Sequence, residues 1–218
     1  IEEGLSVGLI GPNGAGKTTV FSQIMGELQQ TSGNIYLFGK NLRKLPTAER
    51  IRLGVSRTYQ IPRPFIDLSV VENIRVGMMP NSIWSMIVKG PEHFKENKMA
   101  LSVGFSESDF KKPASDLSMG DLRKLELART IATGAKVLLL DEVFAGLTKG
   151  EITQISDLIQ ELRSKGFTIL IVSHDLPAME PLVDKIIAIE RGKIIATGTF
   201  NDVINDQNVR ASYLGNAP

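Results

Sequence analysis

Short apolar runs alternate with amphipathic stretches along the chain, and this pattern predicts an α/β protein. Residues 5–10, 137–140 and 167–172 are mainly apolar and have the length of buried strands. Residues 16–25 and 150–164 repeat their apolar positions at helical spacing. Apolar strands joined by helices are typical of a mostly parallel sheet that helices flank on both faces.

The remaining elements follow from the same periodicities and from turn residues. Further strands are expected at residues 34–38, 55–59 and 185–189, and further helices at residues 47–53, 118–133 and 176–182. The tail, residues 194–214, is expected to form a short strand and two short helices.

The middle of the chain, from residue 80 to residue 113, differs in composition from the segments on either side. Methionine, serine and lysine are scattered among helical patterns near residues 84–88 and 92–103. We interpret residues 80–130 as an α-helical subdomain that is inserted into the α/β fold. One domain is therefore expected over residues 1–218, with an α/β core made of residues 1–79 and 131–218.

Composition narrows the function only slightly. The 218 residues include 25 Lys and Arg against 24 Asp and Glu, so no overall field favours nucleic acid or anionic lipid as a partner. Without cysteine the chain has no disulfides and no thiol-ligated metal. No apolar run approaches the length of a membrane span, and Ile1-Glu-Glu-Gly does not resemble a signal peptide.

A glycine-rich run lies between the first expected strand and the first expected helix. Gly11-Pro-Asn-Gly-Ala-Gly-Lys17-Thr18 fits the phosphate-binding pattern G-x-x-x-x-G-K-[ST]. The glycines let backbone N–H groups point at phosphate oxygens, the lysine supplies positive charge and the Thr18 hydroxyl suits Mg²⁺. A simple turn between strand and helix is the structural alternative. We predict nucleoside triphosphate binding through Gly11, Asn13, Gly14, Ala15, Gly16, Lys17, Thr18 and Thr19.

Two carboxylates end the apolar run of residues 137–140. At the carboxyl end of a parallel strand beside a phosphate loop, Asp141 can hold Mg²⁺ through water. Glu142 would then lie beside the γ-phosphate and could orient or deprotonate the attacking water. The alternative is an acidic strand end that caps the next turn.

Ser118 and Asp121 have capping-box spacing at the start of the helix expected at residues 118–133. A capped helix and nothing more is the structural interpretation. A helix start with a small residue at Gly120 is also an open anion site, which could complete a nucleotide site supplied by a second molecule.

Gln60 and His174 each follow an expected strand. A lone histidine after a strand is more often structural than catalytic. The order in which these residues follow the glycine loop favours the catalytic role.

Taken together, these motifs resemble the ATPase subunit of ATP-binding cassette transporters over essentially the whole chain. The matching segments are residues 11–18 (Walker A), Gln60 (Q-loop), residues 117–121 (signature), residues 138–141 (Walker B), Glu142 (catalytic glutamate), residues 145–148 (D-loop region) and His174 (switch histidine).

The resemblance implies a P-loop NTPase core that hydrolyses ATP with Mg²⁺. It implies that Thr18, Gln60 and Asp141 hold the metal. Glu142, His174 and Gln60 would be catalytic, and Ser118 and Gly120 would contact the ATP of a partner cassette.

The same resemblance implies an assembly. Two cassettes, as a homodimer or a heterodimer, would pack head to tail around two ATP molecules and drive transmembrane permease subunits. The chain would lie in the cytoplasm, peripheral on the inner face of the membrane, and the segment from Ile61 through the helical subdomain would receive a short helix of the permease. Residues 56–65, 68–74 and 144–147 resemble ATPases of branched-chain amino-acid importers, and so does the tail, residues 208–215, which lipopolysaccharide-export ATPases share.

Some positions depart from the family pattern. Met119 replaces a glycine, Asp121 a glutamine, Val143 a proline, and Thr148 an aspartate or asparagine. The family's N-terminal antiparallel strands, with their adenine-stacking aromatic residue, are expected to be truncated, which would weaken nucleotide affinity. A soluble cassette ATPase of repair, translation or assembly remains an alternative, as does a degenerate cassette that only binds ATP.

Overall fold

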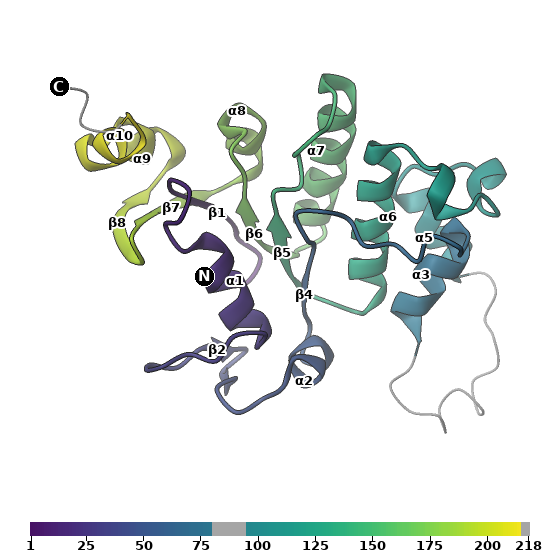
Figure 1. Cartoon of the computed structure of the whole chain (residues 1–218), viewed down its shortest axis with the longest axis horizontal. Coiled ribbons are helices and arrows are strands. Elements are labelled where there is room, and N and C mark those ends of the chain that lie inside the picture. Colours follow the sequence, from purple (N-terminus) through teal and green to yellow (C-terminus); the bar gives the residue numbers. More distant parts are fainter. Residues whose placement is uncertain (80–94, 215–218) are drawn as a thin grey trace.

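A six-stranded sheet forms the centre of the molecule. The computed structural model describes residues 1–79 and 95–214, with side chains to residue 212. The strand order is β4-β5-β6-β1-β7-β8; the first five strands are parallel, and β8 pairs antiparallel with β7 (Figure 1). The strands are β1 Ser6–Ile10, β4 Val55–Arg57, β5 Val137–Asp141, β6 Thr168–Val172, β7 Lys185–Glu190 and β8 Lys193–Gly198. A separate hairpin pairs β2 Tyr36–Leu37 with β3 Lys40–Asn41.

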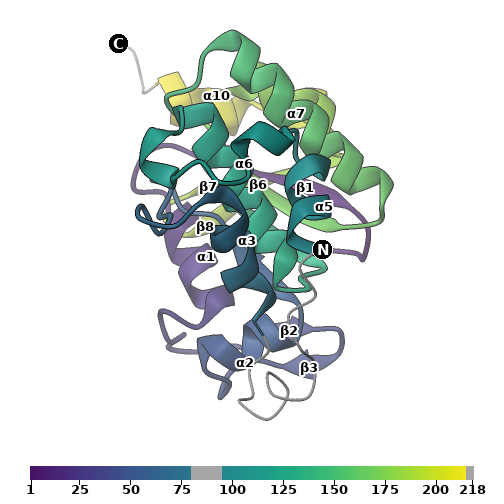
Figure 2. The ribbon, with the colours of Figure 1, turned by 90° about the vertical axis from the view of Figure 1, so that its right-hand side faces the viewer.

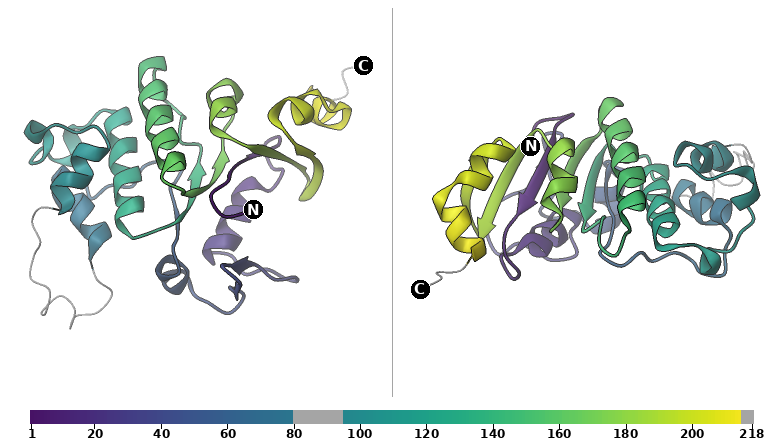
Figure 3. Two further views of the ribbon diagram at one scale, coloured as in Figure 1. Left: turned by 180° about the vertical axis from the view of Figure 1, so that it is seen from behind. Right: turned by 90° about the horizontal axis from the view of Figure 1, so that it is seen from above.

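Helices flank this sheet, as the alternating pattern predicted. The α-helices are α1 Lys17–Met25, α2 Thr47–Arg52, α3 Val70–Met78, α5 Lys95–Ser102, α6 Met119–Ala132, α7 Lys149–Ser164, α8 Leu176–Met179, α9 Phe200–Asn205 and α10 Gln207–Leu214. Short 3₁₀ helices span Glu107–Asp109, Ala114–Asp116 and Glu180–Leu182. In Figures 1 and 3, α1 lies on one side of the sheet and α7 and α8 lie on the other.

Alternate residues of the strands point to opposite faces of the sheet and pack in two separate apolar cores. Leu139 and Leu170 face the core that Phe21 of α1 completes, whereas Leu138 and Ile169 face the core of α6, α7 and α8. Since each buried leucine or isoleucine stabilises the fold by roughly 1.5–3 kcal/mol, the period-two alternation of β5 and β6 fixes which faces the helices cover.

A group of three helices, α3, α5 and α6, extends beyond the sheet edge at β4 (Figure 1), and this group faces the viewer in Figure 2. The helix expected near residues 84–88 lies outside the described residues. No helix was expected at residues 70–78, where the structure has α3. Ser69 caps α3, and Glu72 completes the capping box. This Ser-x-x-Glu spacing before an apolar run was the signal that could have identified the helix.

Three predicted elements differ in extent from those observed. The strand expected at residues 34–38 is reduced to Tyr36–Leu37, because Phe38 has a positive φ of 47° and turns the chain into the hairpin. The strand expected at residues 55–59 ends at Arg57. The helix expected at residues 176–182 divides into α8 and a 3₁₀ turn that contains Pro181, which has no N–H to continue the helix.

Candidate functional site

The glycine loop leaves the end of β1 and turns directly into α1. Gly16 and Gly14 adopt left-handed conformations, with φ of 109° and 78°. A Cβ on Gly11 would lie 2.2 Å from the carbonyl oxygen of Ile189 on β7, so a side chain has no room there. The loop therefore needs glycine both for its backbone conformation and for its closeness to the sheet.

Lys17 is the first residue of α1, and its side chain folds back over the loop. Its Nζ donates to the carbonyl oxygens of Gly11 at 2.6 Å and Pro12 at 3.1 Å. Burial lowers the pKa of Lys17, while the negative charges of Glu142 and Asp141 act in the opposite direction. The ammonium is thus bound to the loop, near enough to the two carboxylates for their charges to act on its pKa. Loop carbonyls hold it in the position from which it could reach a phosphate.

The other loop residues divide by exposure. Ala15 is buried, and its carbonyl accepts the N–H of Gly192 at 2.9 Å, which ties the loop to the β7–β8 turn. Asn13, Thr18 and Thr19 are exposed, so their polar groups are open to a ligand.

Glu142 and His174 meet where neighbouring parallel strands end. Glu142 follows β5 and has a positive φ of 51°, which is rare for a residue with a side chain. Its carboxylate accepts the backbone N–H of His174 at 3.2 Å and lies 3.4 Å from Nε2 of the same residue. The Glu142 side chain is only 12% exposed and that of His174 is 52% exposed. The histidine can therefore reach a ligand that lies over the glutamate.

Asp141 is buried at the end of β5 and is paired with an arginine that the sequence analysis missed. Arg57 of β4 donates to Oδ2 of Asp141 at 2.6 Å and also to Glu27 at 2.7 Å. Since β4 pairs with β5 in parallel, an arginine at the end of β4 was the only hint in the sequence.

The side chains near the loop fit Mg²⁺. The exposed Thr18 hydroxyl and the Asp141 carboxylate, with one oxygen committed to Arg57, offer hard oxygen ligands to an ion that normally keeps several waters. In the part of the chain that the structure describes, no three His, Cys, Asp or Glu side chains gather into a metal site.

A second arginine that the sequence analysis missed links the expected Q-loop, the acidic strand end and α6. Arg123 is 1% exposed. Its guanidinium donates to the carbonyl oxygens of Tyr59 at 2.6 Å, of Gln60, and of Glu142 at 3.3 Å, and it pairs with Glu126 at 3.0 Å. The hydrogen bond from Arg123 therefore fixes the backbone of Gln60, while the Gln60 side chain is exposed. A lone arginine on the buried face of a predicted helix was the available signal.

The start of α6 is not the open anion site that the sequence suggested. Ser118 caps the helix by accepting the N–H of Asp121 at 3.1 Å, as its spacing predicted. The N–H of Gly120, however, donates to Oε1 of Glu151 on α7 at 3.0 Å. A carboxylate of the same chain thus occupies this donor, and the hydrogen bonds of Ser118 and Gly120 do not reach the glycine loop.

The structure explains one of the unusual positions, Thr148, and locates two others. Thr148 caps α7 and shares a capping box with Glu151, so it performs the capping that aspartate or asparagine would also perform. Val143 is fully buried in the main core, and Met119 is 43% exposed on the first turn of α6.

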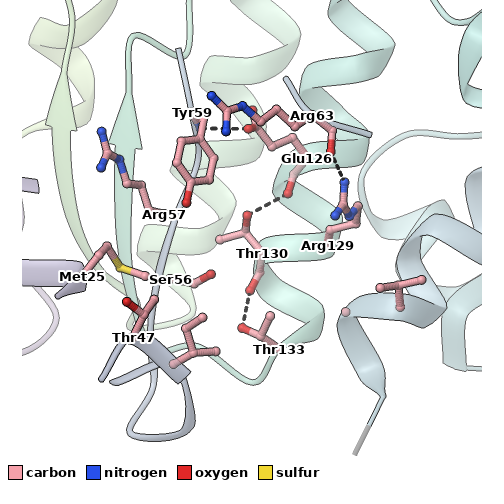
Figure 4. A pocket seen from close by; sticks show the side chains of 13 residues that line it. Met25, Thr47, Ser56, Arg57, Tyr59, Arg63, Glu126, Arg129, Thr130 and Thr133 are labelled. Atoms are coloured by element: carbon pink, nitrogen blue, oxygen red, sulfur yellow. Dashed lines mark hydrogen bonds between the residues drawn. The ribbon is translucent and has the colours of Figure 1, made fainter. Parts of the chain in front are cut away.

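A separate pocket of about 330 Å³ lies between the sheet and the helical group (Figure 4). It is bordered by the ends of α1 and β4 on one side and by α3 and α6 on the other. Arg129 of α6 donates to the carbonyl oxygen of Arg63 at 2.7 Å at the rim. The lining residues are Met25, Thr47, Ile51, Ser56, Arg57, Tyr59, Arg63, Val76, Gly77, Glu126, Arg129, Thr130 and Thr133.

A glycine loop that opens a helix after a parallel strand, facing a carboxylate pair on a nearby strand, defines a P-loop nucleotide-binding protein. A family model described as ABC transporter matches residues 1–145, and the chain belongs to that family. It is an ATP-hydrolysing cassette, a nucleotide-binding subunit of a transporter. Among the described residues, no helix combines the length and the apolar character that a membrane span requires.

Relatives and solved structures agree with this assignment. The high-affinity branched-chain amino acid transport ATP-binding protein LivG of Escherichia coli is 37% identical, over 97% of this chain and 87% of its own. BraF of Pseudomonas aeruginosa, which bears the same description, is 34% identical over 100% of this chain and 89% of its own. A crystal structure of a nucleotide-free ATP-binding cassette from an ABC transporter is 29% identical, with a TM-score of 0.87 over 99% of this chain and 90% of that one.

Proposed function

We propose that this chain is the ATPase of a branched-chain amino-acid importer, and that Lys17, Asp141, Glu142 and His174 form its hydrolytic site. The observation that supports the site best is that the fold brings these four side chains together. The charges of Glu142 and Asp141 act to raise the pKa of Lys17 against the larger effect of burial, and the Glu142 carboxylate lies 3.4 Å from Nε2 of His174. These residues come from the ends of three adjacent parallel strands, β5, β6 and β1.

In this proposal Lys17 exchanges its loop carbonyls for the β- and γ-phosphates of ATP. The exposed Thr18 and the buried Asp141 would hold Mg²⁺ together with Gln60. Bound Mg²⁺ would neutralise charge on the phosphate oxygens. Glu142 accepts the proton of the attacking water or orients it. His174 keeps that carboxylate in place through its N–H and contacts the γ-phosphate.

Ser118 and Gly120 serve a second copy of the cassette in this proposal. Their hydrogen bonds remain within α6 and α7 and do not reach the glycine loop of their own chain. A head-to-tail homodimer, or a heterodimer with a related cassette, would bring them over the ATP on the other loop. Each nucleotide site is therefore completed by both copies.

The permease would dock over the pocket of Figure 4, on the inner face of the membrane. Ile61 and Ile66, in the segment after Gln60, are 72% and 58% exposed, and Phe65 beside them is 48% exposed. Arg129 stacks on the Phe65 ring at 4.8 Å from its centroid, which holds the segment in place. An exposed apolar patch beside a pocket suits a short amphipathic helix of a partner.

We also propose that the helical subdomain includes α3. This helix packs mainly on α5 and α6, and Asn73 of α3 donates to and accepts from the backbone of Phe65. The boundary expected at residue 79 would then move to the segment after Gln60.

Two variants test the hydrolytic site. Lys17→Ala should remove Mg-ATP binding, whereas Lys165→Ala, which changes an exposed lysine at the end of α7, should leave binding within about twofold. Glu142→Gln should preserve binding and lower turnover by roughly a hundredfold or more. Titration calorimetry and phosphate release would measure these effects. A Lys17→Ala protein with unchanged affinity, or a Glu142→Gln protein within a few-fold of the parent rate, would refute the assigned roles.

The transport assignment needs its own experiment. The purified cassette should bind detergent-solubilised permease subunits encoded by neighbouring genes, and together they should drive ATP-dependent uptake of leucine, isoleucine or valine into proteoliposomes. Uptake of none of these amino acids by an assembly that hydrolyses ATP would exclude the proposed substrate class.

A further inference from the structure

The Glu151 carboxylate joins the starts of two helices. Its Oε2 accepts the backbone N–H of Thr148 at 2.9 Å and the Thr148 hydroxyl at 2.8 Å, which completes the capping box of α7. Its Oε1 accepts the N–H of Gly120, in the first turn of α6, at 3.0 Å. One side chain therefore satisfies backbone donors of α7 and α6 at once.

The contact with α6 is close and charged. Gly120 is buried, and a Cβ at this position would lie 2.5 Å from Oε1 of Glu151. Hydrogen bonds from Thr148 lower the pKa of Glu151, and further bonds from Gly120 and Ser118 act in the same direction, so the group is ionised at neutral pH. A carboxylate thus lies at the positive end of a 14-residue helix, an environment that favours anions.

We propose that Glu151 is an internal anion that occupies the Gly120 N–H in the unpaired chain, and that the nucleotide carried by a second copy must displace it. This inference rests on the proposed two-copy site. The γ-phosphate of the second copy and Glu151 are both anions, and a single N–H cannot serve both at full strength. Glu151 is therefore a latch that opposes pairing until nucleotide is present on the other copy.

The latch predicts a specific change in affinity. Glu151→Gln keeps the length of the side chain and its capping oxygen but removes the charge, so the Gly120 donor is released more easily. A head-to-tail dimer releases two such contacts. The dissociation constant of the nucleotide-bound dimer should therefore fall roughly tenfold, the equivalent of about 0.7 kcal/mol for each copy.

The chain offers a matched control. Glu72 completes the capping box of α3 through Ser69, with the same hydrogen bonds that Glu151 makes to Thr148, but it lies on a different helix and does not contact Gly120. Glu72→Gln therefore reproduces the loss of a capping charge without affecting the latch. Both substitutions belong in a Glu142→Gln background, in which slow hydrolysis allows Mg-ATP to hold the dimer.

Sedimentation velocity with Mg-ATP would measure the three proteins over a concentration series. A roughly tenfold tighter dimer for Glu151→Gln, with Glu72→Gln within about twofold of the parent, supports the latch. A parent that pairs with ATP, combined with a Glu151→Gln protein that pairs equally or more weakly, overturns the latch and leaves the two-copy site intact. If none of the three pairs at any concentration, the two-copy site is refuted and the latch with it.

Amide hydrogen exchange of the unpaired, nucleotide-free chain tests the contact independently. Glu151→Ala should accelerate exchange at the Gly120 N–H by roughly tenfold relative to the amides of α3, which serve as the internal reference for folding. An unchanged Gly120 rate in a protein with normal α3 protection would refute the contact on which the latch depends.

Discussion

Replacing Arg123 by methionine should destabilise the fold and separate the Q-loop from the acidic strand end. Methionine matches the length and flexibility of the arginine stem but carries no donors. The guanidinium now donates to three backbone carbonyl groups, of Tyr59, Gln60 and Glu142, and pairs with Glu126. All of these contacts are lost together, and the Glu126 side chain, 10% exposed, loses its ion-pair partner and keeps only the more distant charge of Arg129.

The expected loss of free energy of unfolding follows from the Glu126 carboxylate, which no longer has its ion-pair partner. Removing one partner of a buried ion pair typically costs about 3–5 kcal/mol. Glu126 keeps one strong bond, from the N–H of Tyr59 at 2.8 Å, so the lower end of this range applies. We expect Arg123→Met to lower the free energy of unfolding by about 3 kcal/mol.

The loss of free energy of unfolding should be larger at high pH than at low pH. Burial raises the pKa of Glu126, and the charge of Arg123 is among the effects that oppose the rise. Without Arg123 the folded pKa rises further above the unfolded value, so the folded state holds a proton that the unfolded state releases. The stabilisation that comes from protonating Glu126 in the folded variant is fully present below the ordinary pKa of 4.5. It is lost as the pH rises through the raised pKa of the folded state.

Urea denaturation at pH 5 and pH 8 would measure both effects, with phosphate release as the functional readout. Arg163→Met is the control, because it breaks the exposed pair with Asp184 and should cost less than about 1 kcal/mol. Adding Glu126→Gln should restore part of the stability of Arg123→Met but not its turnover, since the Gln60 and Glu142 carbonyls still lack the guanidinium that links them. A loss below about 1 kcal/mol at pH 8, or a larger loss at pH 5 than at pH 8, would refute the reasoning.

Two further predictions concern local geometry. Gly11→Ala places a Cβ 2.2 Å from the Ile189 carbonyl oxygen and should lower the free energy of unfolding by more than about 2 kcal/mol, whereas Gly14→Ala, with open space around it, should cost only about 1 kcal/mol for its positive φ. Equal losses in thermal denaturation would contradict this. Thr148→Val removes the cap of α7 and should cost about 1 kcal/mol, whereas Thr148→Asn should be nearly neutral; a valine variant as stable as the parent would show that the cap contributes nothing.

The amino-acid sequence alone was sufficient for the features that depend on neighbouring residues. The glycine loop between strand and helix, the acidic pair at the end of β5 and the alternation of strands with helices are each contained in a short window. The family assignment and the mostly parallel sheet are confirmed. The cap at Ser118 was predicted because its partner, Asp121, lies only three residues away.

Only the tertiary structure determined which charged side chains meet. Arg57 and Asp141 are separated by 84 residues, Arg123 and the Gln60 carbonyl by 63, and Gly120 and Glu151 by 31. A sequence pattern reports the period of an element and the residues at its ends, but not the register of one element against another. That register is set by the packing of the two apolar cores. It gave Asp141 a buried arginine and placed a carboxylate at the start of α6, which from the sequence alone had been an open anion site.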